Sequence, residues 1–248
     1  MSSSRSKIIS KPYILLKRNN EDKLKKHRKP QLQNSSPNII PLNYELNQSC
    51  CRLGEELYRE KNIITETENF FSMPALGPMG IPGYLLLCSK KHYLGYSNIP
   101  NSIILEFEEF FALMRKRLKK LYNLPTIAFE HGPSHDGFHC GNSLDHAHIH
   151  ILPTKQNIKN ILPQYFTIFK ITHFHELNKN NLDQTAPYVF FEDQQEKRYL
   201  LKPKKPLESQ FLRKIICKVH DCDCWNWKEH FGLDTFLDTL NLVRGDVK

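Results

Sequence analysis

The stretch CGNSLDHAHIHILP, residues 140–153, decides the fold and carries the most informative residues of the chain. It places His146, His148 and His150 at alternate positions, with apolar residues between and after them. Successive side chains of a β-strand point to opposite faces of a sheet. We therefore predict a strand here that has three imidazoles on one face and packs its apolar face on the core. The small and polar residues before it suit an entering loop.

Three imidazoles on one strand face suit chemistry at phosphorus. A histidine titrates near neutral pH, so one ring can be a nucleophile while a neighbouring ring donates a proton or carries positive charge. A phosphoryl centre needs both the nucleophile and the positive charge. Imidazole also ligates zinc, copper and iron. Six of the chain's twelve histidines lie between His131 and His150, so a metal-dependent hydrolase using this cluster is one alternative.

Three motifs carry a resemblance to a known family. HAHIHIL, residues 146–152, resembles the signature of the histidine triad (HIT) family, in which three histidines alternate with apolar residues. PGYLLLCSKKH, residues 82–92, is similar to that family's first motif. FEHGP, residues 129–133, is similar to the strand that runs beside the triad strand. The resemblance covers roughly residues 50–155.

The first motif departs from the family pattern at two positions. His92 matches its final histidine, but Tyr84 stands where many members have histidine, and Ser89 stands where they have proline. The phenol of Tyr84 can still donate a hydrogen bond.

The resemblance implies an activity and roles for individual residues. It implies a nucleotide phosphoester, anhydride or phosphoramidate hydrolase, or a nucleotidyl transferase, that forms a covalent nucleotidyl-histidine at His148. The main-chain carbonyl of His146 would hold the second ring nitrogen of His148, and His150 would contact a phosphate or leaving-group oxygen. The residues expected to bind substrate are His92, Asn142, Ser143, Tyr84 and Glu130. Glu130 is a candidate for the acidic residue that holds ribose in small family members. No metal ion or other cofactor is implied.

The predicted fold class is α+β, an HIT-like antiparallel sheet with a long helix packed on it and a C-terminal extension of hairpins and helices. Apolar residues at three- and four-residue spacing predict the long helix over residues 101–123, with Asn101 and Ser102 as N-cap and Glu106 assisting. Shorter helices are expected at residues 50–62, 157–166, 209–220, where Ser209 is the cap, and 231–242. Strands are expected at residues 62–67, 69–74, 83–92, 125–132 and in a hairpin at 187–203 that turns at 193–195.

Composition and the family resemblance together divide the chain into three predicted regions. Residues 1–42 form a basic tail, residues 43–155 the HIT-like domain, and residues 156–248 a C-terminal extension packed on it. Residues 1–32 hold ten Lys and Arg against two acidic residues, and so account for +8 of the net charge of +9. Such a tail can contact nucleic acid or an acidic surface, or remain solvated. A second alternative is therefore a non-catalytic binding protein on the HIT scaffold that engages RNA or a protein partner.

Cysteine usage and hydropathy bear on the compartment. Seven cysteines form no disulfide framework, no apolar run approaches eighteen residues, and the first residues lack the apolar core of a signal peptide. These features predict a cytoplasmic protein without a membrane span. Cys217, Cys222 and Cys224 have an unusual spacing for zinc, and the sequence leaves metal binding there open. Triad proteins often form dimers, and the sequence leaves a homodimer as a possibility for this chain.

Overall fold

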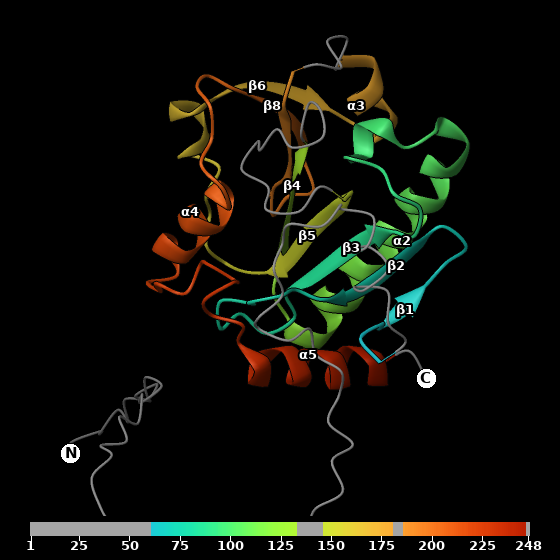
Figure 1. Ribbon diagram of the computed structural model, residues 1–248, viewed down its shortest axis with the longest axis vertical. Helices are drawn as coiled ribbons and strands as arrows, with labels where there is room; N and C mark the ends of the chain where they lie inside the picture. Colours follow the sequence, from blue (N-terminus) through green and yellow to red (C-terminus); the bar gives the residue numbers. More distant parts are fainter. Residues whose placement is uncertain (1–60, 133–145, 181–185, 247–248) are drawn as a thin grey trace, which may run out of the picture. The chain divides into compact units, whose positions relative to one another are not determined.

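The computed structural model describes residues 61–132, 146–180 and 186–246. Within these residues, one eight-stranded sheet runs in the order β1-β2-β3-β5-β4-β7-β8-β6, and every neighbouring pair is antiparallel (Figure 1). The strands are β1 (Thr65–Glu66), β2 (Phe70–Pro74), β3 (Leu85–Ser89), β4 (Thr126–Gly132), β5 (His148–Pro153), β6 (Phe166–Ile171), β7 (Tyr188–Glu192) and β8 (Arg198–Pro203). The predicted α+β class and the predicted order of strands and helix up to the triad strand are confirmed.

Helices and short 3₁₀ turns connect and cover these strands. They are η1 (Tyr96–Asn98), α2 (Asn101–Tyr122), η2 (Leu162–Gln164), α3 (His175–Asn180), α4 (Phe211–Val219) and α5 (Leu233–Gly245). The helix predicted at residues 157–166 is wrong, because only a turn and η2 form there. Pro163 has no backbone N–H to donate and so interrupts a longer helix. The helix predicted at residues 50–62 and the basic tail lie outside the described residues, apart from Lys61 and Asn62 in a turn.

The long helix α2 packs along one face of the sheet, where Figure 1 shows it running behind β3 and β5. Its buried residues recur at helical spacing, and the ring of Phe107 lies 5.0 Å from that of Phe70 on β2. The predicted N-cap is wrong, because Pro100 holds that position without a side-chain cap bond. Glu106 instead accepts hydrogen bonds from the main-chain and side-chain nitrogens of Asn69, at 2.8 and 2.6 Å.

The C-terminal extension completes the same sheet instead of forming a separate layer. β7 pairs with β4, the neighbour of the triad strand, and β8 and β6 follow outward. The hairpin predicted at residues 187–203 is confirmed. Its Glu192 is buried and paired with both Arg115 of α2, at 3.0 Å, and Arg198 of β8, at 2.9 Å. Because the new strands add directly to β4, the extension and the triad strand share one framework.

The segment that joins two helices of the extension, α4 and α5, packs against the loop between β2 and β3. α4 begins after Gln210, which replaces the predicted Ser209 as N-cap residue and has a left-handed backbone. The main-chain N–H of Gly77 donates to Phe231 at 3.0 Å, ahead of α5. A Cβ on Gly77 would lie 2.6 Å from the Cα of Trp227, so only glycine permits this approach, and its φ of +59° also favours glycine.

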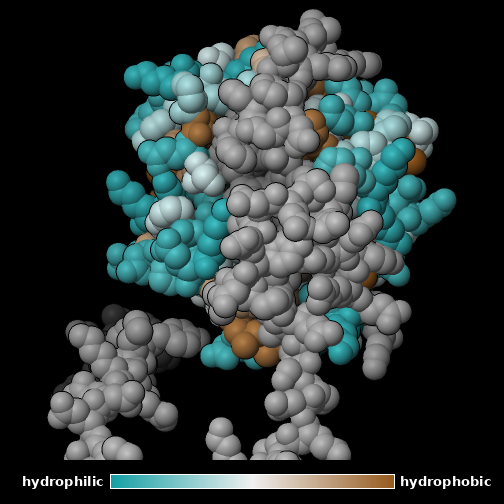
Figure 2. Space-filling model, in the orientation of Figure 1, coloured by the Kyte–Doolittle hydropathy of each residue, from teal (hydrophilic) through white to brown (hydrophobic). Residues whose placement is uncertain are grey.

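The described surface is mainly hydrophilic on the side that Figure 2 shows, with hydrophobic residues in small separate spots. The larger exposed apolar side chains are spread over α2 (Leu105 and Leu113), the turn before β6 (Tyr165), β6 (Phe169) and α5 (Leu233 and Leu242). None of the helices in the described part of the chain combines the length and the apolar character needed to cross a bilayer.

Candidate active site

The triad histidines project from β5 and the residues just before it onto the face of the sheet opposite α2. Phe129 of β4 lies beside His150 in the register, and its ring stacks on the imidazole with centroids 4.4 Å apart. The rings of His148 and His150 are 4.9 Å apart. The alternate residues Ile149 and Ile151 are fully buried on the α2 side. The predicted division of the strand into an imidazole face and a core face is confirmed.

His148 has the geometry of a neutral nucleophile. Its Nδ1 lies 2.6 Å from the main-chain oxygen of His146. A carbonyl oxygen can only accept, so Nδ1 carries the proton and Nε2 keeps a free lone pair. The pKa of His148 is lowered to about 4, first by burial and then by the charges of His146 and Arg213, against the opposing effect of the carbonyl bond. The ring is therefore uncharged at neutral pH, and the side chain remains partly exposed.

His146 connects the triad to the first motif. Its Nε2 lies 2.7 Å from the main-chain oxygen of Ser89, so this nitrogen donates and Nδ1 is left as an acceptor. The Nδ1 of His92 lies 3.4 Å from that acceptor and can donate to it. Burial lowers the pKa of His146, with the Ser89 bond acting in the opposite direction. His92 is thus brought next to the triad, where the sequence predicted a substrate-binding residue.

His150 is held by two residues from distant parts of the chain. The hydroxyl of Tyr84 lies 2.8 Å from its Nδ1, and the guanidinium Nη1 of Arg213 lies 3.4 Å from that hydroxyl. All three side chains are buried. Burial raises the pKa of Tyr84 to about 12, and burial together with neighbouring positive charge holds the pKa of His150 well below its ordinary value. Tyr84 therefore places a protonated phenol in hydrogen-bond contact with His150, at the position where many triad proteins have histidine.

Comparison with known proteins identifies the family. The model of the HIT domain matches residues 57–157, a span that contains β1 to β5 and all three triad histidines. Residues 57–157 of this chain form a histidine triad (HIT) domain. A curated relative, the bis(5'-adenosyl)-triphosphatase of Dictyostelium discoideum, is 31% identical over 109 residues, which cover 42% of this chain and 66% of the relative. The match thus leaves a third of that enzyme's length without a counterpart.

Solved structures of HIT proteins also match. A HIT-like protein of Bartonella henselae is 17% identical over 54% of this chain and 90% of its own, with a TM-score of 0.35. A histidine triad nucleotide-binding protein of Sulfolobus tokodaii is 21% identical over 55% of this chain and 89% of its own, also at 0.35. The yeast Ap4A phosphorylase in complex with Ap4A is 13% identical over 64% of this chain and 65% of its own, at 0.37.

The HIT domain brings only some of the predicted substrate-binding residues to the triad. His92 and Tyr84 lie there, whereas Asn142 and Ser143 lie outside the described residues. Glu130 is placed on the α2 side of β4, because Phe129, its neighbour in the strand, faces the triad. The expectation that Glu130 holds a ribose is therefore not supported by its position.

Glu130 has a different set of partners on that opposite face. It accepts hydrogen bonds from the main-chain N–H of Tyr96, at 2.7 Å, and from the hydroxyl of Tyr188, at 2.8 Å. Burial raises the pKa of the Glu130 carboxyl to about 8, although both hydrogen bonds act in the opposite direction. This carboxyl joins η1 and β7 to the central sheet and is a structural group.

Sequence reasoning missed Arg213 and placed His131 only in the six-histidine cluster. Arg213 of α4 lies on the stripe that also buries Leu212, Ile216 and Cys217, and an arginine within an apolar helical stripe is the signal that could have found it. His131 lies on the triad side of β4, where its Nε2 is 3.5 Å from the main-chain nitrogen of Leu212. Burial lowers the pKa of His131 to about 3, so it adds a further neutral imidazole beside the triad.

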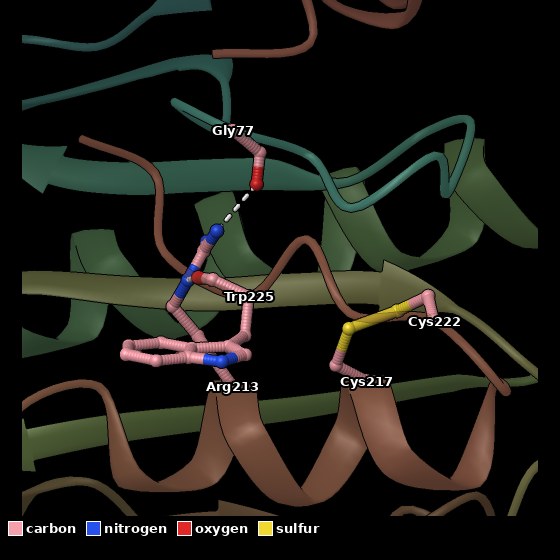
Figure 3. Close-up of a disulfide and its surroundings, with 5 residues drawn as sticks. All are labelled: Gly77, Arg213, Cys217, Cys222 and Trp225. Atoms are coloured by element: carbon pink, nitrogen blue, oxygen red, sulfur yellow. Dashed lines mark hydrogen bonds between the residues drawn. A yellow bond between two sulfur atoms is a disulfide. The ribbon is translucent and has the colours of Figure 1, made fainter. Parts of the chain in front are cut away.

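The three cysteines for which the sequence left zinc binding undecided lie together at the end of α4. Cys217 and Cys222 form a disulfide, and the sulfur of Cys224 belongs to the same cluster, with all three sulfurs within 4.8 Å of one another (Figure 3). His220 is not part of this cluster, because its Nε2 lies 2.9 Å from the hydroxyl of Thr154. Two disulfide-bonded sulfurs do not act as thiolate ligands, so in this state the cluster offers a metal only Cys224.

Proposed function

We propose that this HIT protein cleaves nucleotide phosphoesters, anhydrides or phosphoramidates, or transfers the nucleotidyl group, through a covalent nucleotidyl-histidine at His148. One observation carries the proposal. The Nδ1 of His148 is occupied by the main-chain oxygen of His146, and its Nε2 has no hydrogen-bond partner among the described residues, on a partly exposed ring whose pKa is about 4. A neutral imidazole with one nitrogen held and the other free is what nucleophilic attack requires.

In the first step, Nε2 of His148 attacks the α-phosphorus of the nucleotide. The new N–P bond forms as the bond from phosphorus to the leaving group breaks, and its electron pair leaves with the departing oxygen or nitrogen. The ring becomes positively charged, and its Nδ1–H remains held by the carbonyl of His146, which stabilises that charge. His150 is the candidate hydrogen-bond donor to the leaving group, since its Nδ1 is bonded to Tyr84 and its Nε2–H remains for substrate. A phosphate leaving group departs as an anion, and an amine leaving group takes its proton from water.

In the second step, water or another acceptor attacks the same phosphorus. The N–P bond breaks and its electrons return to Nε2 of His148, while the proton of the attacking hydroxyl is released to solvent or to the product phosphate. His148 ends as the neutral ring that it was at the start, and His150 keeps its proton throughout. A P–N bond to imidazole is labile, which suits an intermediate that must turn over.

A dinucleoside polyphosphate is the substrate class that we propose first. The curated relative is named a bis(5'-adenosyl)-triphosphatase, and it shares 31% identity over the aligned region. We propose that His92, which lies next to His146, contacts this substrate near the leaving group. Asn142 and Ser143 complete the proposed phosphate-binding set.

Intact-mass spectrometry after brief incubation with substrate tests the proposal. The panel contains diadenosine triphosphate and tetraphosphate, adenylated and guanylated amines, and nucleotide sugars, with a quench too brief to cleave the P–N bond. We expect a mass gain of one nucleoside monophosphate that is absent in His148→Ala. The control is His173→Ala, because His173 is an exposed histidine with no bond to the triad.

The same panel can refute the proposal. A folded protein that gives neither adduct nor turnover on any substrate would contradict it and favour the binding-protein alternative. Turnover without an adduct, lost with a chelator and restored by one metal ion, would favour the metal-dependent alternative. Turnover that survives in His148→Ala would exclude that residue as the nucleophile.

Further predictions from the sequence belong to this proposal. We propose that residues 43–155 are the HIT domain and residues 156–248 its extension, that the protein acts in the cytoplasm, and that the basic tail contacts nucleic acid or an acidic surface. We also propose that the protein forms a homodimer. Localisation of a tagged full-length chain, nucleic-acid binding with and without residues 1–42, and the mass in solution test these points separately.

A further inference from the structure

We infer that Arg213, supplied by the C-terminal extension, is a positioning residue of the triad site. It orients the hydroxyl of Tyr84 toward His150 and thereby sets which ring nitrogen of His150 carries the proton. It also keeps a fixed positive charge beside the imidazoles that would meet a phosphate. Its role in turnover rests on the proposed function, whereas its effect on His150 can be measured without any substrate.

The direction of the hydrogen bonds follows from the donor inventory. A guanidinium can only donate, so the oxygen of Tyr84 accepts from Nη1 of Arg213. The single hydroxyl proton of Tyr84 is then directed to Nδ1 of His150, 2.8 Å away. With Nδ1 accepting, neutral His150 carries its own proton on Nε2. This is the tautomer that can donate a hydrogen bond to a phosphate or leaving-group oxygen.

The guanidinium is held in place by main-chain oxygens of two separate segments. Its Nε donates to Trp225 at 2.9 Å, and its Nη2 donates to Gly77 in the loop between β2 and β3 (Figure 3). Its charge centre also lies 5.6 Å from the centroid of the Tyr84 ring. A planar fork with fixed donors can meet these carbonyls and the phenol together, which the single ammonium of lysine cannot do.

The charge of Arg213 has no acidic partner in the part of the chain that the structure describes. Its hydrogen bonds there go to carbonyl oxygens and a phenol, and none of its described contacts is an ion pair. The side chain is only 3% exposed, and a buried cation without a counter-charge is costly. The neutral imidazoles nearby do not offset the positive charge of Arg213, whereas a negatively charged phosphate group bound at the triad would.

The test measures the proton position on His150 directly. Long-range ¹H–¹⁵N spectra of labelled protein at pH 7 report which imidazole nitrogen is protonated. We expect His150 in the wild type to be protonated at Nε2 alone, with exchange between the two tautomers in Tyr84→Phe and in Arg213→Met. Arg213→Lys keeps the charge and is expected to restore part of the wild-type spectrum.

Arg244 provides the matched control. This partly exposed arginine of α5 also donates from the C-terminal extension to main-chain oxygens, those of Ile63 and Lys61, and these bonds lie away from the triad residues. Arg244→Met should lose a similar kind of packing and leave the tautomer of His150 unchanged. In the proposed reaction, Arg213→Met should lower kcat about 10²-fold with little effect on KM, as for loss of one preorganised donor.

Three results would overturn the inference: a wild-type His150 protonated at Nδ1, an unchanged tautomer in both Arg213→Met and Tyr84→Phe, or the same change in Arg244→Met. If Arg213→Met does not fold, Tyr84→Phe decides, because it keeps the ring under the guanidinium and removes only the hydroxyl. The expected spectra without any nucleotide turnover would refute the proposed function and leave the role of Arg213 standing.

Discussion

Replacing Glu130 by glutamine should remove a specific pH dependence of the protein's stability. Glu130 is 1% exposed, and its pKa is raised from an ordinary 4.5 to about 8. Between these values the folded state holds a proton on Glu130 that the unfolded chain has released. Stability from this group is therefore fully present below pH 4.5 and is lost as the pH rises toward 8. Glutamine cannot ionise and has nearly the same shape.

The size of the effect follows from the two pKa values. Linkage gives a loss of about 1.4 kcal/mol for each pH unit between them. From pH 5 to pH 7, the Glu130 carboxyl should lower the free energy of unfolding by about 2.5 kcal/mol. The buried histidines act in the opposite direction, because their lowered pKa values make the folded state release protons first. They are the same in both proteins, so they cancel in the difference between wild type and Glu130→Gln.

Urea unfolding at pH 5, 6, 7 and 8 measures this difference. We expect the stability of Glu130→Gln relative to the wild type to rise steadily across that range, whatever its value at pH 5. The variant should also keep the wild-type KM in any nucleotide assay, since Glu130 faces away from the triad. A difference that stays flat with pH would refute the raised pKa, and a large rise in KM would return Glu130 to the substrate site.

Three further predictions test other parts of the molecule. In the proposed reaction, kcat/KM should stay constant from pH 8 to about pH 5 and fall only near the pKa of His148, about 4; a pH–rate profile that already falls near pH 6.5 would show an ordinary, solvated imidazole. Reducing the Cys217–Cys222 disulfide, whose cysteines are 5 residues apart, should cost about 2 kcal/mol of unfolding free energy, seen as a lower urea midpoint with reductant that a Cys217→Ser variant does not show. Gly77→Ala should destabilise the protein by about 2 kcal/mol more than Gly80→Ala in thermal or urea unfolding, because both have positive φ but only a Cβ at Gly77 meets another main chain; equal losses would refute the clash.

Local sequence patterns were sufficient to predict the elements that carry the triad. The alternation from His146 to His150 fixes which residues share a face of β5 wherever the strand lies in the sheet, because the two-residue period is a property of the strand itself. The same rule applied to β4 would have placed Glu130 on the face opposite Phe129 and His131. That error came from reading the motif by position in the family instead of by strand face.

Contacts between distant segments could not be predicted in this way. Glu106 was expected to cap its own helix, but Asn69, 37 residues earlier, offers two donors to the same carboxylate. The bond between Arg213 and Tyr84 joins residues 129 positions apart. No local pattern reports such a pair, and the signal that remains is an arginine in an apolar helical stripe, which alone does not name its partner.

The separation of Arg213 from Tyr84 also has a consequence for how the protein is made. Translation delivers the chain from its N-terminus, so Tyr84 and the three histidines leave the ribosome well before α4 does. During synthesis the growing chain therefore passes through a stage in which β3 and β5 can pair while the hydroxyl of Tyr84 has no guanidinium to orient it. The histidines reach their final hydrogen-bonding arrangement only when the later-made helix has folded back onto them, so the site is completed only after α4 has left the ribosome.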